Sequence, residues 1–103
     1  MLEAGQEALS FAVGKTRSDL NLDRKLVLSL VKDVEIIGEA AGKVSDEARI
    51  ELGEIPWQDI VSMRNRLIHV YFDFDLDVVW DTIVKDLPPL VRILEKAIPS
   101  DNT

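Results

Sequence analysis

A long run of apolar residues at helical spacing constrains this chain more than any other feature. The run recurs every three or four positions at Leu26, Leu30, Val34, Ile37, Ala41 and Val44, and it is widened by Val27, Val31 and Ala40. An apolar stripe with this period is typical of an amphipathic helix that buries one broad face. The pattern predicts a helix from roughly Leu22 to Lys43, with Asn21 or Asp19 as its N-cap.

Two glycines, Gly38 and Gly42, lie one turn apart inside this predicted helix. Glycine is destabilising in a helix interior, by about 1 kcal/mol relative to alanine. One interpretation is that both glycines are tolerated flaws. The other is that they leave a smooth groove where a second helix crosses closely. The sequence does not decide between the two.

The remaining segments also predict helices. The expected elements are Leu2 to Val13, ended by Gly14; Asp46 to Leu52, begun by Ser45 and ended by Gly53; Trp57 to Tyr71, with Pro56 in its first turn; Asp75, as a cap, through Val84; and a last helix ending near Ile98. Pro88 and Pro89 interrupt a continuing apolar pattern, so we expect a kink or break there.

No stretch alternates as a half-buried strand would, so the fold class is all-α, a bundle of four or five helices. With 103 residues the chain is long enough for one domain. We place this domain at residues 1–99 and expect a frayed tail at residues 100–103. Trp57 and Trp80 are the expected aromatic anchors of the core.

Composition excludes several function classes. The chain has no cysteine and one histidine, which rules out thiolate or multi-histidine metal sites within one chain, and nothing in the sequence calls for a cofactor. Its net charge of -7 argues against broad binding to nucleic-acid phosphates, so any such function needs a local basic site. With no apolar run of membrane-spanning length and no signal-peptide pattern, the expected location is cytoplasmic, away from the membrane.

The stretch from Met63 to Tyr71 is that local basic site. It contains the only histidine, His69, the only tyrosine, Tyr71, and two arginines, Arg64 and Arg66. Histidine transfers protons near neutral pH, and arginine binds a phosphate through two parallel hydrogen bonds. Together these side chains are a minimal set for cleaving RNA without a metal ion, in which the ribose 2′-hydroxyl attacks the adjacent phosphate.

Helix geometry complicates the pairing of Arg64 with His69. On an ideal helix His69 lies over Asn65 and Arg66, whereas Arg64 points about 140° away and falls within the apolar arc. Three interpretations remain open. Arg64 pairs with an acid such as Glu35 or Glu39, or the helix is distorted near His69, or the site combines residues from two copies of the chain.

These residues also carry a resemblance to a known family. Arg64-x4-His69-x-Tyr71 resembles the Arg-x4-His-x-Tyr signature of the HepT-like family, the HEPN-domain toxins of bacterial and archaeal toxin–antitoxin pairs. The similarity covers about Leu2 to Leu94, including Glu35-Ile-Ile-Gly-Glu-Ala40, Ile55-Pro-Trp57, Ile60, Met63-Arg-Asn65, Asp75-Leu-Asp77, Val79-Trp80 and Asp86-Leu-Pro88. Family members usually carry some ten more residues before the first helix.

The resemblance implies a HEPN-like bundle with up-down topology that forms a homodimer, and a metal-independent endoribonuclease. His69 would be the general acid and base, and Arg64 the phosphate ligand, in a cleft shared by both protomers. Asn65 and Arg66 would help to position RNA. The implied partner is a small nucleotidyltransferase antitoxin, which would attach a nucleotide to Tyr71 and so repel RNA from the cleft.

A second hypothesis comes from a different class of protein. The chain would be a non-catalytic helical subunit that docks a nucleotidyltransferase and binds a nucleotide, with Arg64 and His69 holding phosphate or packing a dimer. The acidic net charge favours this hypothesis slightly, whereas the combination of histidine, arginine and tyrosine favours the nuclease.

Overall fold

The computed structural model describes residues 1–68 and 75–97, and in these two ranges all regular structure is helical. The elements are α1 (Leu2–Ala12), α2 (Asp19–Leu22), α3 (Arg24–Gly42), α4 (Asp46–Glu51), α5 (Trp57–Ile68), α6 (Leu76–Asp81), the π-helical turn η1 (Thr82–Asp86) and α7 (Leu87–Ala97). The all-α prediction is confirmed. The predicted domain end at residue 99 and the tail lie outside the described residues.

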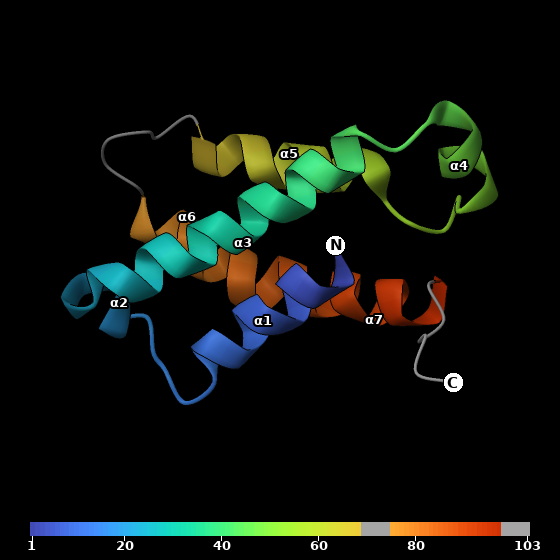
Figure 1. Ribbon diagram of the computed structural model, residues 1–103. Helices are drawn as coiled ribbons and strands as arrows, with labels where there is room; N and C mark the ends of the chain where they lie inside the picture. Colours follow the sequence, from blue (N-terminus) through green and yellow to red (C-terminus); the bar gives the residue numbers. More distant parts are fainter. Residues whose placement is uncertain (69–74, 98–103) are drawn as a thin grey trace.

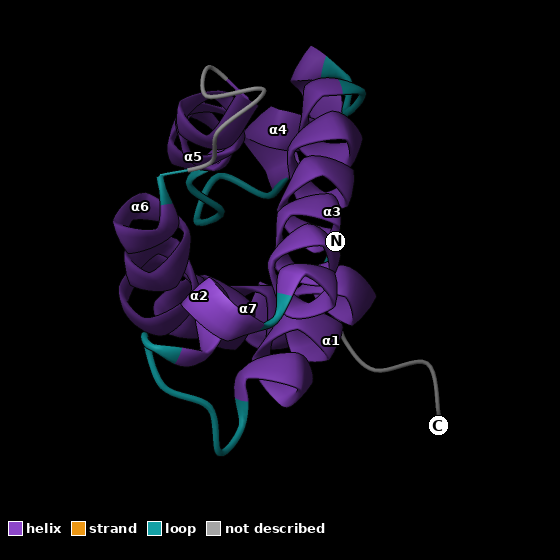
Figure 2. Cartoon of the chain, turned by 90° about the vertical axis from the view of Figure 1, so that its left-hand side faces the viewer, coloured by secondary structure: helices purple, strands orange, loops and turns teal. Residues whose placement is uncertain are grey.

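Helix α3 is the central element of the bundle. It packs against α1 on one side and α5 on the other, while α6, η1 and α7 form the remaining wall (Figures 1 and 2). Successive long helices run in opposite directions, as expected for an up-down bundle (Figure 1). The stripe that predicted α3 is buried as expected, and Leu30, Val34, Ile37 and Ala41 are fully inaccessible to solvent.

The predicted start of α3 is wrong by two residues. The helix begins at Arg24, and its N-cap is Asp23, whose carboxylate accepts a hydrogen bond from the Leu26 amide at 3.1 Å. Asp19 and Asn21, the two expected caps, belong instead to the short helix α2, which the sequence pattern did not predict. Asp23 has an extended backbone between the two helices, so the chain turns there and not earlier.

Three other expected helix boundaries are confirmed. Ser45 caps α4 by accepting a hydrogen bond from the Ala48 amide at 3.1 Å. Asp75 caps α6, accepting from the amides of Asp77 at 3.0 Å and Val78 at 3.3 Å. Gly14 follows α1 with a φ of 75°, a left-handed conformation that favours glycine.

The irregularity expected at Pro88 and Pro89 is a π-helical turn and not a break. The backbone is helical throughout Leu76–Ala97, and at η1 the Leu87 amide bonds to the Thr82 carbonyl, one residue farther than in an α-helix. A proline lacks the amide that would bond four residues back, and its ring clashes with that carbonyl. The wider turn lets the helix continue past both prolines.

The two tryptophans differ in their burial. Trp57 is 9% exposed, and its indole donates a hydrogen bond to the Leu52 carbonyl at 3.2 Å. Arg49 of α4 lies over its ring at 5.8 Å and also donates to the Ala41 carbonyl at the end of α3. Trp80 is only half-buried and packs against the edge of the core.

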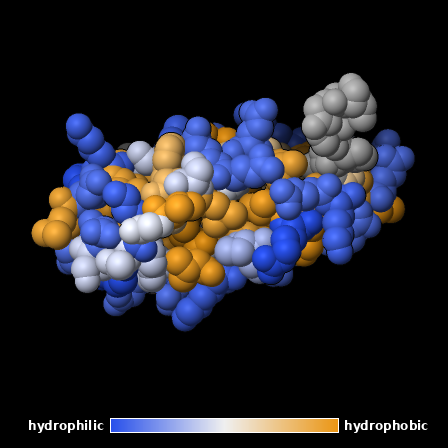
Figure 3. Space-filling model, turned by 90° about the horizontal axis from the view of Figure 1, so that it is seen from below, coloured by the Kyte–Doolittle hydropathy of each residue, from blue (hydrophilic) through white to orange (hydrophobic). Residues whose placement is uncertain are grey.

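One face of the molecule carries a concentration of apolar surface. Seen from below, hydrophobic side chains gather over the side on which α1 lies (Figure 3). Among the exposed hydrophobic residues, Phe11 and Val13 near the end of α1 are 39% and 75% exposed. None of the helices in the described part of the chain has the length and hydropathy needed to span a bilayer.

Candidate active site

Helix α5 carries the described part of the candidate site. Arg64, Asn65 and Arg66 lie in its last two turns, whereas His69 and Tyr71 lie outside the described residues. The roles expected for His69 and Tyr71 therefore stay predictions. The three described residues differ in what they contact, because neighbouring residues on a helix point in directions about 100° apart.

Arg64 lies in the interface between α5 and α3, directly against Gly38. A Cβ atom added at Gly38 would overlap Cβ and Cγ of Arg64 and come within 2.9 Å of its Cδ. Gly38 therefore permits a close helix crossing, which confirms the close-crossing interpretation for this glycine. At Gly42 no atom of the described residues lies within 4 Å of such an atom, so no helix in that part of the chain crosses closely there.

The guanidinium group of Arg64 has few partners among the described residues. Its Nη1 donates to the Asn65 side-chain oxygen at 3.3 Å, and its Nε is buried without a hydrogen-bond partner. No ion pair joins Arg64 to Glu35 or Glu39 within residues 1–68 and 75–97, so the first of the three interpretations, pairing with such an acid, is not found there. The distorted-helix and two-copy interpretations remain, since both depend on His69.

Arg66 points to the opposite side of α5 and has a carboxylate partner. Its guanidinium forms an ion pair with Asp86 of η1 at 3.0 Å, and both side chains are about half exposed. Such an exposed pair contributes little to stability, in the range of about 0 to 1 kcal/mol. The pair is therefore easily broken by a competing anion. Sequence reasoning missed Asp86, which is 20 residues away in the chain.

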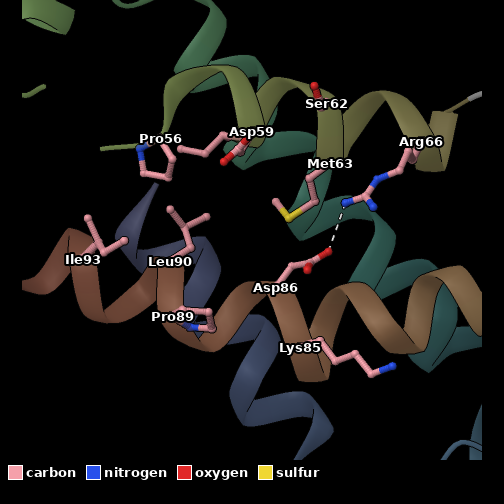
Figure 4. Close-up of a pocket in the computed structure, with 11 residues that line it drawn as sticks. Pro56, Asp59, Ser62, Met63, Arg66, Lys85, Asp86, Pro89, Leu90 and Ile93 are labelled. Carbon is pink, nitrogen blue, oxygen red and sulfur yellow. Dashed lines mark hydrogen bonds and ion pairs between the residues drawn. The ribbon is translucent and has the colours of Figure 1, made fainter. Parts of the chain in front are cut away.

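The Arg66–Asp86 pair closes one end of a groove between α5 and the η1–α7 helix (Figure 4). The groove has a volume of about 580 Å³. Its polar lining comes from Asp59, Ser62, Arg66, Lys85 and Asp86, and its apolar lining from Pro56, Ile60, Met63, Pro89, Leu90 and Ile93. Arg66 contributes to this groove but Asn65 does not, so the two residues predicted to position RNA are not brought together here.

A buried carboxyl group, Asp33 of α3, also escaped the sequence analysis. It is 2% exposed, and one of its oxygens has no hydrogen-bond partner among the described residues. Burial raises the pKa of Asp33 to about 7, and the neighbouring Glu7 carboxyl of α1 adds to the rise. The signal was present in the sequence, because Asp33 follows Leu30 by three positions and precedes Ile37 by four. No group of three or more metal-ligating side chains occurs in the described ranges.

The comparison with known proteins adds a family to this geometry. The family described as Ribonuclease HepT-like matches residues 1–97. The chain belongs to the HepT-like ribonuclease family. The match spans α1 through α7, so it includes Gly38, Arg64 and the groove as well as the Arg-x4-His-x-Tyr stretch.

Several curated relatives support the same assignment. A protein of Thermococcus cleftensis named as a probable ribonuclease HepT is 37% identical over 78 residues, which are 76% of this chain and 71% of the relative. A protein of Caldanaerobacter subterraneus that is provisionally named an RNase is 33% identical over 88 residues, or 85% of this chain and 79% of the relative. A provisionally named RNase of Methanocaldococcus jannaschii is 29% identical over 98 residues, with coverages of 95% and 81%. No solved structure gave a significant match.

Proposed function

We propose that this HepT-like protein is a metal-independent endoribonuclease and the toxin of a toxin–antitoxin pair. Its site is a cleft at a homodimer interface, to which the two protomers contribute Arg64 and His69. Family membership and the RNase names of the relatives support an RNA substrate. One observation carries the choice of Arg64: its guanidinium forms no ion pair with an acid in the described ranges, whereas Arg66 does.

The chemistry needs one proton-transfer group and one cation. In the proposed reaction His69 accepts the proton of the ribose 2′-hydroxyl as the 2′-oxygen forms a bond to phosphorus. The bond from phosphorus to the 5′-oxygen then breaks, and the protonated His69 gives its proton to the leaving 5′-oxygen, so that the products are a 2′,3′-cyclic phosphate and a 5′-hydroxyl. Arg64 donates hydrogen bonds to the non-bridging oxygens, whose negative charge increases in the transition state.

Arg66 and Asn65 have different proposed parts in binding. Arg66 reaches RNA phosphate by exchanging its exposed partner Asp86 for the incoming anion. Asn65 accepts the hydrogen bond from Arg64 and thereby restrains the guanidinium. Asn65 thus supports the phosphate ligand, and Arg66 extends the basic surface toward the groove.

We propose a small nucleotidyltransferase as the antitoxin, with Tyr71 as the residue it modifies. Tyr71 follows His69 by two positions in a stretch whose basic residues attract phosphate. A nucleotide attached there would place one or more phosphates beside the RNA site and repel the substrate. Because the chain as a whole has a net charge of -7, RNA is attracted mainly by this local basic stretch, and a negative group attached there would be most effective in repelling it.

The test is cleavage of labelled RNA by purified, unmodified protein in excess EDTA, beside His69→Ala and Arg64→Ala. We expect the parent to cleave and to leave 2′,3′-cyclic phosphate ends, and each variant to lose at least about 100-fold in rate. Intact-mass spectra of the same samples confirm that Tyr71 carries no nucleotide. Expression without the partner should arrest growth, and His69→Ala should relieve the arrest.

Two results would overturn this proposal. Cleavage that is unchanged in His69→Ala would exclude His69 as the proton-transfer group. Unmodified parent protein that cleaves no RNA and binds the nucleotidyltransferase would instead support a non-catalytic nucleotide- and partner-binding subunit.

A further inference from the structure

We propose that Gly38 of α3 is a positioning residue for Arg64. The missing side chain at residue 38 lets the aliphatic part of Arg64 lie in contact with the α3 backbone, so that its guanidinium is held in one orientation at the α3–α5 interface. This inference rests on the proposed function, because it assigns Gly38 a role through the phosphate ligand. It also makes a structural claim that can be tested without RNA.

The first step of the argument is the closeness of the crossing. A Cβ at residue 38 would overlap Cβ and Cγ of Arg64, and the Cβ of Arg64 is fixed to the backbone of α5. A clash with the end of a flexible side chain is relieved by a rotamer change, but a clash with Cβ moves the helix. Any residue other than glycine at position 38 therefore displaces α5 or Arg64.

The second step is the state of the Arg64 side chain. It emerges from the apolar arc of α5 and is half-buried, and its Nε is buried with no partner in the described ranges. An unpaired buried donor is destabilising, because it has lost its hydrogen bonds to water without gaining others. Because such a donor is retained at an otherwise well-packed interface, we infer that Arg64 is kept there for its positive charge. The missing side chain of Gly38 leaves the room that Arg64 occupies.

The third step is the comparison with Gly42. It lies one turn farther along the same helix, and a Cβ added there would meet no atom of residues 1–68 and 75–97 within 4 Å. Both glycines belong to α3, Gly38 in its interior and Gly42 as its last residue, and their surroundings differ. Gly42→Ala is a matched control for Gly38→Ala, because it makes the same chemical change where no contact depends on it.

The first measurement uses the parent protein and needs no RNA. Hydrogen exchange at the Nε–H of each arginine is measured by NMR. We expect the Arg64 Nε–H to exchange roughly tenfold more slowly than that of the exposed Arg66, because burial restricts access of solvent. Equal exchange rates would overturn the proposal, even if no variant could be purified.

The second measurement compares the two alanine variants. Gly38→Ala should lose the slow exchange of Arg64 and lower the rate of RNA cleavage per folded molecule about tenfold or more, with most of the loss in kcat. In Gly42→Ala the exchange rate of the Arg64 Nε–H and the rate of RNA cleavage should each stay within about twofold of the parent value. Circular dichroism at the assay temperature gives the folded fraction. Unchanged exchange and cleavage in Gly38→Ala would overturn the proposal.

A double variant separates positioning from general loosening of the bundle. If Gly38 acts through Arg64, adding Gly38→Ala to Arg64→Ala should change the residual cleavage by less than about twofold. If adding Gly38→Ala lowers the cleavage rate of Arg64→Ala as much as it lowers that of the parent, Gly38 acts through residues other than Arg64. If the parent cleaves no RNA while Arg64 shows slow exchange that only Gly38→Ala removes, the proposed function fails but the positioning of Arg64 stands.

Discussion

Asp33 is an aspartate that lies buried in the folded protein. Its carboxyl group lies between α3 and α1, near Glu7, and one oxygen has no hydrogen-bond partner within residues 1–68 and 75–97. Burial penalises the charged form, so the group holds a proton in the folded protein up to about pH 7. In the unfolded chain the same carboxyl loses its proton near its ordinary value of 3.8.

This difference predicts how stability depends on pH. Between about pH 4 and pH 7 the folded protein retains a proton that the unfolded chain has released, so stability should fall as pH rises through this range. Asp33→Asn cannot ionise and should flatten the slope. Thermal melts followed by circular dichroism at a series of pH values would measure how stability changes with pH in both proteins.

The control for Asp33 is an exposed carboxylate on another helix. Glu47→Gln on α4 should keep the slope of the parent, because an exposed side chain loses little contact with water on folding. A slope that survives unchanged in Asp33→Asn would show that another group controls the pH dependence.

At the scale of the elements, caps and apolar periodicity determine where helices lie, and the sequence revealed most of this. The buried stripe of α3 and the caps Ser45 and Asp75 follow from local rules. The start of α3 does not, because Asp19, Asn21 and Asp23 are equally good caps by residue type. The choice of Asp23 depends on α2, a helix of four residues that is too short to show a period.

The capping role of Asp23 can be tested directly. Asp23→Ala removes the acceptor of the Leu26 amide and should cost about 1 kcal/mol of folding stability. Urea unfolding would measure the loss. Lys25→Ala, an exposed change two residues later, should stay within about 0.5 kcal/mol of the parent. Equal losses in both variants would argue against the cap.

The proline pair shows a second limit of local rules. Pro88 and Pro89 predict an irregular backbone, but not whether the helix breaks or widens. Ile83, Leu87 and Leu94 on this wall are fully buried, so the core holds residues on both sides of the prolines. A break would expose part of that surface, and the π-helical turn avoids it. This outcome depends on packing against other helices, which the local pattern does not contain.

For the molecule as a whole, the candidate site could be predicted only in part. The sequence singled out Arg64 and placed it in the apolar arc, where the structure finds it against Gly38. It did not predict that Arg66 would pair with Asp86 across a groove. Contacts between residues so far apart in the chain arise from the arrangement of helices. The relation of Arg64 to His69 depends further on whether two chains meet.

A mixed-dimer experiment tests the proposed two-chain site. Arg64→Ala and His69→Ala are each expected to be inactive alone. If each site joins Arg64 of one protomer to His69 of the other, a mixed dimer has one site with both changes and one site intact. Random mixing makes about half of the dimers mixed, so about a quarter of the parent activity should return.

The mixing is done by unfolding equal amounts of the two variants together and refolding them, with each variant refolded alone as a control. Sedimentation would establish that dimers form. A site built within one chain predicts no recovery, because every site in the mixed dimer then lacks one residue. Recovery would therefore mean that the 140° between Arg64 and His69 on an ideal helix is bridged by a second protomer, and not by distortion of α5.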